Sequence, residues 1–207
     1  MFGVKRWATA LGSVLVLAFV TGCTMQPEDF KDTGPKLKIE EYFLGETRAW
    51  GIFEDRFGKL RRQCVVDIMG TMDGDELVLD ERFDYADGEK DRRVWRIRKL
   101  DEHNYEGRAD DIIGVAKGVS YGNALNWSYD LDLQIGDNSL RVHFNDWMFL
   151  QPDGVLMNRA RVTKWGFDIG EVTLMFKPVD GAVKTSRRTD SMGEYATYGE
   201  AREAANR

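Results

Sequence analysis

The chain has 207 residues, of which 43% are hydrophobic and 31% charged, enough to bury a core within one domain of ordinary size. Its formal net charge of -6 excludes the strongly basic face that binding of nucleic acid phosphates needs. The same acidity predicts that any attachment to an anionic membrane is covalent rather than electrostatic. With 21 Gly and only 4 Pro, the composition indicates short elements joined by many tight turns.

The first 22 residues have the layout of a bacterial export signal. Lys5 and Arg6 supply a positive start, and residues 7–20 form an apolar run broken only by small residues. This run is shorter than the roughly 20 apolar residues that a spanning helix needs. We therefore expect residues 1–22 to be a cleaved signal peptide. An uncleaved anchor helix and an ordinary signal peptide without lipidation are the alternatives.

Residues 20–23 (VTGC) resemble the bacterial lipobox, in which small residues precede the cysteine that receives diacylglycerol. This pattern predicts a lipidated Cys23, with the membrane as a partner that is held through several acyl chains. Thr24 stands where an aspartate usually retains such proteins in the inner membrane. We therefore expect an outer membrane lipoprotein facing the periplasm, with the inner membrane as the alternative.

The remaining chain divides into three parts. Residues 23–38 are polar and contain Pro and Gly, which predicts a lipidated tether between membrane and domain. Residues 39–180 carry the alternating pattern described below and form the expected β-barrel domain. Residues 181–207 are polar and charged, which predicts a flexible or weakly helical tail.

Alternation of apolar and polar residues recurs through the domain and predicts antiparallel strands. Turn residues such as Asp73-Gly74-Asp75 and Asp87-Gly88-Glu89 separate the runs. A sequential meander of this kind hides its edges by closing, so we expect an all-β, antiparallel, up-and-down barrel of about 8–10 strands, with a two-sheet sandwich as the alternative. The expected runs lie near residues 47–53, 60–68, 77–85, 95–97, 105–111, 125–135, 140–148, 155–165 and 171–177.

The polar faces of these runs carry charges such as Asp130, Asp132 and Arg82, which need water rather than lipid. A barrel hung on a lipid anchor therefore fits better than one that spans the membrane. With Cys23 acylated, Cys64 has no disulfide partner. Its alternation with apolar neighbours favours a small buried residue over a reactive thiol.

Three charged residues share the apolar faces, and their direction has two interpretations. Arg62, Glu81 and Asp146 each alternate in register with apolar residues and are expected to project inward. A buried charge is costly unless it is paired. One interpretation is a structural network in which Arg62 or Arg159 pairs with Glu81 or Asp146. The other is a polar anchor at the end of a ligand cavity.

No residue set predicts a catalytic, metal or cofactor site. Residues 118–122 (GVSYG) match the nucleophile-elbow pattern G-x-S-x-G, but a strand rather than a helix is expected after them. His103 and His143 have no cysteine pair to complete a zinc site. Nucleotide-binding glycine signatures and calcium-loop spacing are also missing. We expect no cofactor and no metal.

Several stretches resemble domain-of-unknown-function family 3833. They are GIFEDRFGKLRRQ (51–63), LDERFDYADGE (79–89), and the segments at 108–131 and 144–176. The resemblance implies a proteobacterial lipoprotein with a lipocalin-like, or calycin, barrel and no established activity. Genes of this family tend to lie near genes for fatty-acid modification, which implies a link to lipids.

Together these features predict a lipid-anchored periplasmic barrel that binds or shelters a small amphipathic ligand, such as a fatty acid. One alternative is a structural or interaction protein with a filled core, marked by outward Trp50, Trp147 and Trp165. The less favoured alternative is an enzyme acting on modified lipids through Asp146 or Glu81. The residues expected to contact a ligand are Arg62, Glu81, Phe83, Tyr85, Trp127, Tyr129, Phe144, Asp146, Met148, Arg159 and Arg161.

Overall fold

The structure is a computed structural model that describes residues 24–135 and 138–179. The expected signal peptide, the lipidation site Cys23 and the tail at 181–207 lie outside the described residues. No helix in the described part is long and apolar enough to cross a membrane.

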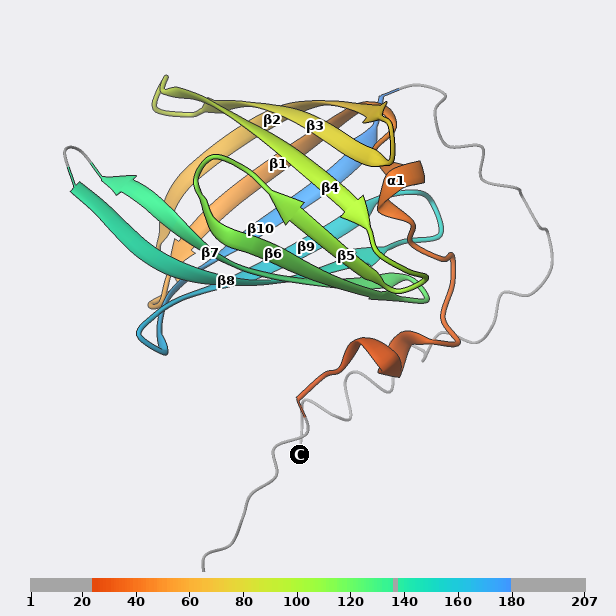
Figure 1. The fold of residues 1–207 in the computed structure, drawn as a ribbon. Coiled ribbons are helices and arrows are strands. Elements are labelled where there is room, and N and C mark those ends of the chain that lie inside the picture. The colour runs from red at the N-terminus through yellow and green to blue at the C-terminus, as the bar shows by residue number, and fades with distance from the viewer. Residues whose placement is uncertain (1–23, 136–137, 180–207) are drawn as a thin grey trace, which may run out of the picture.

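Ten antiparallel strands of the described chain close into one barrel (Figure 1). Each strand pairs with its neighbours in sequence, and β1 pairs with β10 to complete the circle. The predicted all-β, up-and-down barrel is therefore confirmed. The strands are β1 (Gly45–Asp55), β2 (Leu60–Asp73), β3 (Glu76–Tyr85), β4 (Lys90–Lys99), β5 (Asn104–Arg108), β6 (Ile112–Tyr121), β7 (Ala124–Ile135), β8 (Asn138–Leu150), β9 (Leu156–Lys164) and β10 (Phe167–Pro178).

Strand β6 is the one strand of the described barrel that the pattern of large apolar residues did not predict. Its inward positions near the closed end are the small residues Ala116, Gly118 and Ser120, all of them buried. Gly118 has to be small, because a Cβ there would overlap the ring of Trp127 on the paired strand β7. The large side chain of β7 thus fills the space that β6 leaves, and alternation by size is lost from β6.

One end of the barrel is closed by a short helix, α1 (Ile39–Tyr42), together with its neighbours Leu37 and Phe43 (Figure 1). The side chains of Leu37, Ile39, Tyr42 and Phe43 are all buried in the core. The Tyr42 hydroxyl lies 3.0 Å from the carbonyl oxygens of both Gly154 and Phe176. Because α1 is tied to β10 and to the β8–β9 turn, it forms a fixed plug.

The segment before α1 lies against the barrel, which differs from the expected tether. A short 3₁₀ helix, η1 (Pro27–Phe30), contacts β6 and β7. Phe30 packs on the rings of Trp147 and Phe149, with centroids 5.9 and 5.4 Å away. The Thr33 hydroxyl lies 2.7 Å from the Asn123 side-chain oxygen. The polar composition of the segment concealed these few docking residues.

Candidate ligand-binding cavity

A cavity of about 610 Å³ runs through the inside of the barrel. This volume lies within the range of small-molecule sites in proteins. At one end the cavity meets Ile39 and Phe43 of the plug, and at the other it reaches the exposed residues Gln63 and Glu89. It is therefore closed at the α1 end and open at the opposite end, where the β1–β2, β3–β4 and β9–β10 hairpins lie.

The middle of the cavity has an aromatic wall. Tyr129 stacks on Phe144 with ring centroids 5.1 Å apart and planes 4° from parallel. The Trp95 ring lies edge-on to Trp127 at 6.0 Å and to Tyr129 at 5.5 Å. Such pairs hold each other in place and leave a smooth apolar surface. The other predicted aromatic residues, Phe83 and Tyr85, also line the cavity and stack 6.0 Å apart near its open end.

Two carboxyl groups face the deep part of the cavity from opposite strands. Glu81 on β3 is paired in register with Arg93 on β4, and Asp146 on β8 accepts a 3.3 Å hydrogen bond from the Tyr129 hydroxyl. The second carboxyl oxygen of Asp146, Oδ1, is buried and has no hydrogen-bond partner among the described residues. Arg93 forms its ion pair at 2.6 Å with Asp111. The deep cavity is therefore polar but incompletely hydrogen-bonded.

Burial raises the pKa of both carboxyl groups. The pKa of Glu81 rises to about 7 because burial outweighs the nearby Arg93 charge. The pKa of Asp146 also rises to about 7 through burial, with the Glu81 charge adding to the effect and the Tyr129 hydrogen bond opposing it. Near neutral pH each carboxyl group is therefore protonated part of the time, and it can then donate as well as accept a hydrogen bond.

The open end holds one arginine over an aromatic ring. The Arg62 guanidinium carbon lies 3.4 Å from the centroid of the Tyr85 ring. Arg62 also forms ion pairs with Glu89 and, at 3.4 Å, with Asp87 in the β3–β4 turn. Its Nε is buried and is the atom that lies 3.4 Å from Asp87 Oδ2, without forming a hydrogen bond to it. Arg62 is thus held at the mouth between the Tyr85 ring and two acidic turn residues.

The structural network considered from the sequence takes a different form. Arg62 pairs with the turn residues rather than with Glu81 or Asp146. The cation near the two carboxyl groups is instead Arg93, which the sequence reasoning missed. A signal was present, because Arg93 alternates with Trp95 and Ile97 and therefore shares their inward face.

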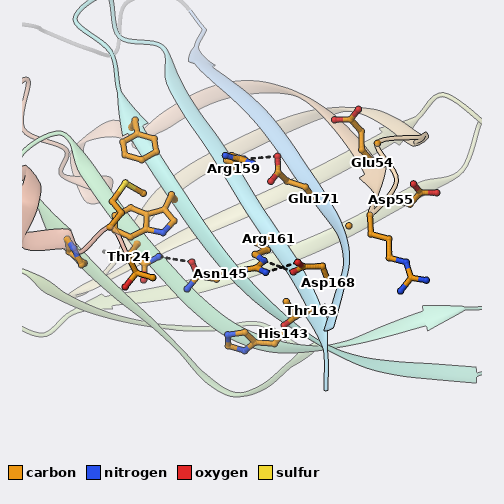
Figure 2. Close-up of a pocket in the computed structure, with 18 of the residues that line it drawn as sticks. Thr24, Glu54, Asp55, His143, Asn145, Arg159, Arg161, Thr163, Asp168 and Glu171 are labelled. Atoms are coloured by element: carbon orange, nitrogen blue, oxygen red, sulfur yellow. Dashed lines mark hydrogen bonds and ion pairs between the residues drawn. The ribbon is translucent and has the colours of Figure 1, made fainter. Parts of the chain in front are cut away.

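The inclusion of Arg159 and Arg161 among the residues near a ligand is corrected by the structure. Both side chains are exposed on the outer face, where Arg159 pairs with Glu171 at 2.7 Å and Arg161 pairs with Asp168 (Figure 2). Successive side chains of a strand point to opposite faces. The buried positions of β9 are Leu156, Asn158, Ala160 and Val162, so the two arginines must point outward.

The remaining expected residues line the cavity. Arg62, Glu81 and Asp146 border it, as do Met148 and all five predicted aromatic residues. Cys64 also lines it and is half-buried, with burial raising the pKa of its thiol. Of the tryptophans considered as an outer patch, Trp50 and Trp165 are exposed, whereas Trp147 packs against Phe30.

The G-x-S-x-G segment has a structural role in the β6–β7 hairpin. The Ser120 hydroxyl is buried and lies 3.0 Å from the Leu37 carbonyl oxygen and 3.2 Å from that of Ala124. Gly122 adopts a positive φ of 52°, and its carbonyl accepts a 2.7 Å hydrogen bond from the Leu37 amide. This segment therefore fastens the chain before α1 to the barrel, and its hydroxyl does not face a cleft.

A second hollow of about 1180 Å³ lies outside the barrel, along the outer faces of β8, β9 and β10 (Figure 2). Most of its lining residues are of charged or polar type, and they include the two outward arginine pairs. It extends from Thr24 and Met25 to Arg56 and Gly58 in the β1–β2 turn. This groove connects the start of the described chain with the open end of the barrel.

Fold and cavity define the protein as a closed antiparallel β-barrel with an internal space of ligand size. The chain belongs to the DUF3833 family of proteins of unknown function, whose model matches residues 17–178. Among solved structures, it is similar to a protein of unknown function from the DUF3598 family of Nostoc punctiforme, with a TM-score of 0.53 and 14% identity. The match covers 70% of this chain and 51% of that one, so this chain spans about half its length. At this identity the likeness concerns the fold alone. No curated protein matches at a significant level.

Proposed function

We propose that the barrel binds the apolar part of a small lipid-like molecule, such as a fatty acid, close to a membrane that holds the chain through Cys23. The observation that carries this proposal is the cavity of about 610 Å³, lined by aromatic and aliphatic residues and bordered by an arginine at its open end. The expected place is the periplasmic face of the outer membrane, which Thr24 after the lipobox-like cysteine favours.

The cavity wall supports an apolar guest. Each methylene group removed from water contributes about 0.8 kcal/mol, so an acyl chain gains several kcal/mol from contact with a dry wall. The stacked pair Tyr129–Phe144 and the edge-on pair Trp95–Trp127 are already in place without the guest. Binding to a preformed wall avoids the entropy of ordering it.

The mouth supports an anionic head group. Arg62 Nε lies 3.4 Å from Asp87 Oδ2 without a hydrogen bond, and an oxygen of a carboxylate or phosphate could take the place of Asp87 and complete one. Its present partners Asp87 and Glu89 lie in a turn and are exposed to solvent. They can therefore turn away while Arg62, held over Tyr85, keeps its position.

The deep carboxyl pair supports an orientation in which the head group of the guest lies at the mouth and its neutral end lies deep in the cavity. Tyr85 lies four positions beyond Glu81 on β3, which is about 13 Å along an extended strand. A carboxylate of the ligand, if placed near Glu81 and Asp146, would meet like charge whenever these two residues are ionised. When protonated, they can hydrogen-bond a neutral hydroxyl or carbonyl group within the guest. The charged end of the ligand therefore belongs at Arg62 and the neutral end at the carboxyl pair.

A titration with a fluorescent polyene fatty acid tests the proposal. The purified full chain should bind it with 1:1 stoichiometry, whereas Cys64→Phe should weaken binding by about tenfold because the new ring occupies the cavity. Val65→Phe is the matched control, since residue 65 is adjacent on β2 and points outward. Equal affinity of both variants, or no binding by the parent, would contradict the proposal.

The anchor needs a separate test. Cells given a clickable palmitate analogue should incorporate the label into the parent chain and not into Cys23→Ala. Labelling that persists in the variant would show that the acyl chain is carried elsewhere.

A second candidate function is acid–base catalysis on a bound lipid. It is favoured by one observation, the two carboxyl groups whose pKa values lie near 7 inside a cavity. Asp146→Asn distinguishes it from binding. A catalytic role requires that this variant retain the fatty acid but lose conversion of a modified one. In a binding protein no conversion occurs in either form.

A further inference from the structure

Three large aromatic side chains are exposed together at the open end of the barrel. Phe57 is 80% exposed in the β1–β2 turn, and Trp165 and Phe167 are 87% and 72% exposed at the β9–β10 turn. Side chains of this size and exposure are uncommon in clusters, and a cluster marks a surface that contacts something apolar. We call these two turns, residues 55–60 and 164–168, the aromatic tips.

The aromatic tips are neighbours in space. Their strands β1 and β10 are paired up to Asp55 and Gly170, and the Arg56 amide donates a 3.1 Å hydrogen bond to the Ile169 carbonyl. Both turns lie at the end of the barrel opposite α1 (Figure 1). They therefore form one surface beside the mouth of the cavity.

Positive charge surrounds the aromatic tips, although the whole chain carries a net charge of -6. Arg61, Arg62 and Arg161 near the tips are each paired with acidic residues. The cations at the tips that have no ion-pair partner among the described residues are Arg56, Lys59 and Lys164. The Arg56 guanidinium carbon lies 4.8 Å from the Phe57 ring centroid, and Lys164 Nζ lies 4.3 Å from that of Trp165. Cations therefore flank the exposed rings. The overall acidity led to the expectation that membrane contact is not electrostatic, but it conceals this local excess.

We propose that the aromatic tips dock on the surface of an anionic phospholipid bilayer. Aromatic rings with a polar edge or a neighbouring cation prefer the headgroup level of a membrane. Lysine and arginine near an anionic membrane surface are attracted to its phosphates. Phe57, Trp165 and Phe167 would enter the interface while Arg56, Lys59 and Lys164 meet the phosphates. Charge and exposure together identify a lipid surface as the occupant.

Docking in this way brings the mouth of the cavity to the bilayer. Arg62, two residues beyond the β1–β2 tip, would then lie near the headgroups, and an acyl chain could enter the barrel without crossing bulk water. This consequence rests on the proposed function, whereas the docking itself does not. The outer groove that begins at Thr24 also reaches Arg56 and Gly58, so an anchor on Cys23 and the tips can serve one membrane.

Quenching by brominated lipid tests the docking directly. The full chain is reconstituted in vesicles of phosphatidylcholine with a minority of phosphatidylglycerol, whose acyl chains carry bromine or none. The difference in tryptophan fluorescence between the parent and Trp165→Phe gives the fluorescence contribution of Trp165. Bromine should reduce that contribution about twofold or more if the ring lies in the interface. An equal contribution in both lipids would place the ring in water or against protein and overturn the proposal.

Trp50→Phe is the matched control. Trp50 is also exposed but lies on the outer wall of β1, about 20 Å along the strand from Arg56. Its contribution should be little affected by bromine. Quenching of Trp50 without quenching of Trp165 would mean that the barrel lies on its side, which also contradicts docking by the tips.

Charge reversal tests the electrostatic part. Lys59→Glu with Lys164→Glu should remove about half of the quenching or more, because two attractive contacts become repulsive. Lys117→Glu with Lys177→Glu changes the net charge equally at exposed positions away from the tips and should have little effect. Equal losses in both double variants would show attraction to total charge and refute a specific role of the tips.

The fatty-acid titration without vesicles separates the two proposals. Trp165→Phe should keep the affinity of the parent, because Trp165 does not line the cavity. Normal fatty-acid binding without quenching refutes the docking alone. Quenching without fatty-acid binding supports the docking and refutes the proposed function.

Discussion

The two ends of the barrel differ in what their side chains contact. At the α1 end, Leu37, Ile39 and Phe43 are buried against strand residues, and the polar groups of Tyr42 and Ser120 have backbone partners. At the open end the side chains form exposed ion pairs, and large aromatic rings face outward. Exposed ion pairs contribute little, about 0–1 kcal/mol each. Stability is therefore concentrated at one end, which leaves the other free to contact a ligand and a surface.

Truncation of a buried side chain in the closed half is expected to have the largest effect on stability. Leu156 is fully buried beside the plug, and Leu156→Ala should lower the free energy of unfolding by about 2–5 kcal/mol. Leu133 lines the open half and is exposed, so Leu133→Ala should cost less than about 1 kcal/mol. Urea denaturation measures both. Equal costs would show that the two halves contribute alike.

Adding a single methyl group beneath the plug should destabilise the fold nearly as much. A Cβ at Gly70 would overlap the Phe43 carbonyl oxygen, which is backbone and cannot move aside without displacing the plug. We expect Gly70→Ala to cost about 2–3 kcal/mol. Gly58→Ala is the comparison, since it meets no neighbour within 4 Å and bears only the strain of its φ of 74°, about 1 kcal/mol. A thermal melt in which Gly58→Ala is the less stable would contradict this.

The buried carboxyl pair predicts a pH dependence of intermediate size. Because the folded pKa of Asp146 is about 7 and its ordinary value is 3.8, the folded state binds the proton more tightly. This group therefore lowers stability as pH rises from about 4 to 7, and the penalty is complete above 7. The stability of Asp146→Asn relative to the parent should accordingly rise by about 2 kcal/mol between pH 5 and pH 8. A relative stability that stays level or falls would show that Asp146 is ionised in the folded protein at pH 5.

Cys64 offers the mildest probe, because it reports on the cavity without disturbing it. Its thiol lines the cavity, and burial raises its pKa, so a maleimide should react slowly. Saturating fatty acid should slow the reaction by about a further tenfold. Asp67→Cys in a Cys64→Ser background places a thiol on the exposed face of the same strand, where fatty acid should have no effect. Equal protection of both thiols would point to a general change in the protein.

How far the sequence predicts this molecule depends on the size of its inward side chains. Long runs such as β7, with Leu125, Trp127 and Tyr129 on one face, reveal the strand and its inner side. The alternating pattern did not predict strand β6, because its inward residues are small. Their small size is explained by Trp127, which fills the space beside them. Local alternation cannot show which residues face each other across a barrel.

The candidate site shows the same division. Alternation within one strand was enough to orient Arg62, Glu81 and Asp146 inward, and it would have sufficed for Arg93. It also argues against Arg159 and Arg161, which flank the inward Ala160. The partners of these charges could not be predicted, since Arg93 and Asp111 come together only when β4 and the β5–β6 turn close on each other.

Native mass spectrometry of the protein purified from membranes shows whether the barrel holds a guest. A fraction of the parent should carry one additional lipid-sized mass, which is released on unfolding. Cys64→Phe should lose that mass while Val65→Phe retains it. A parent that is always empty, or an adduct that survives equally in Cys64→Phe, would contradict a guest inside the barrel.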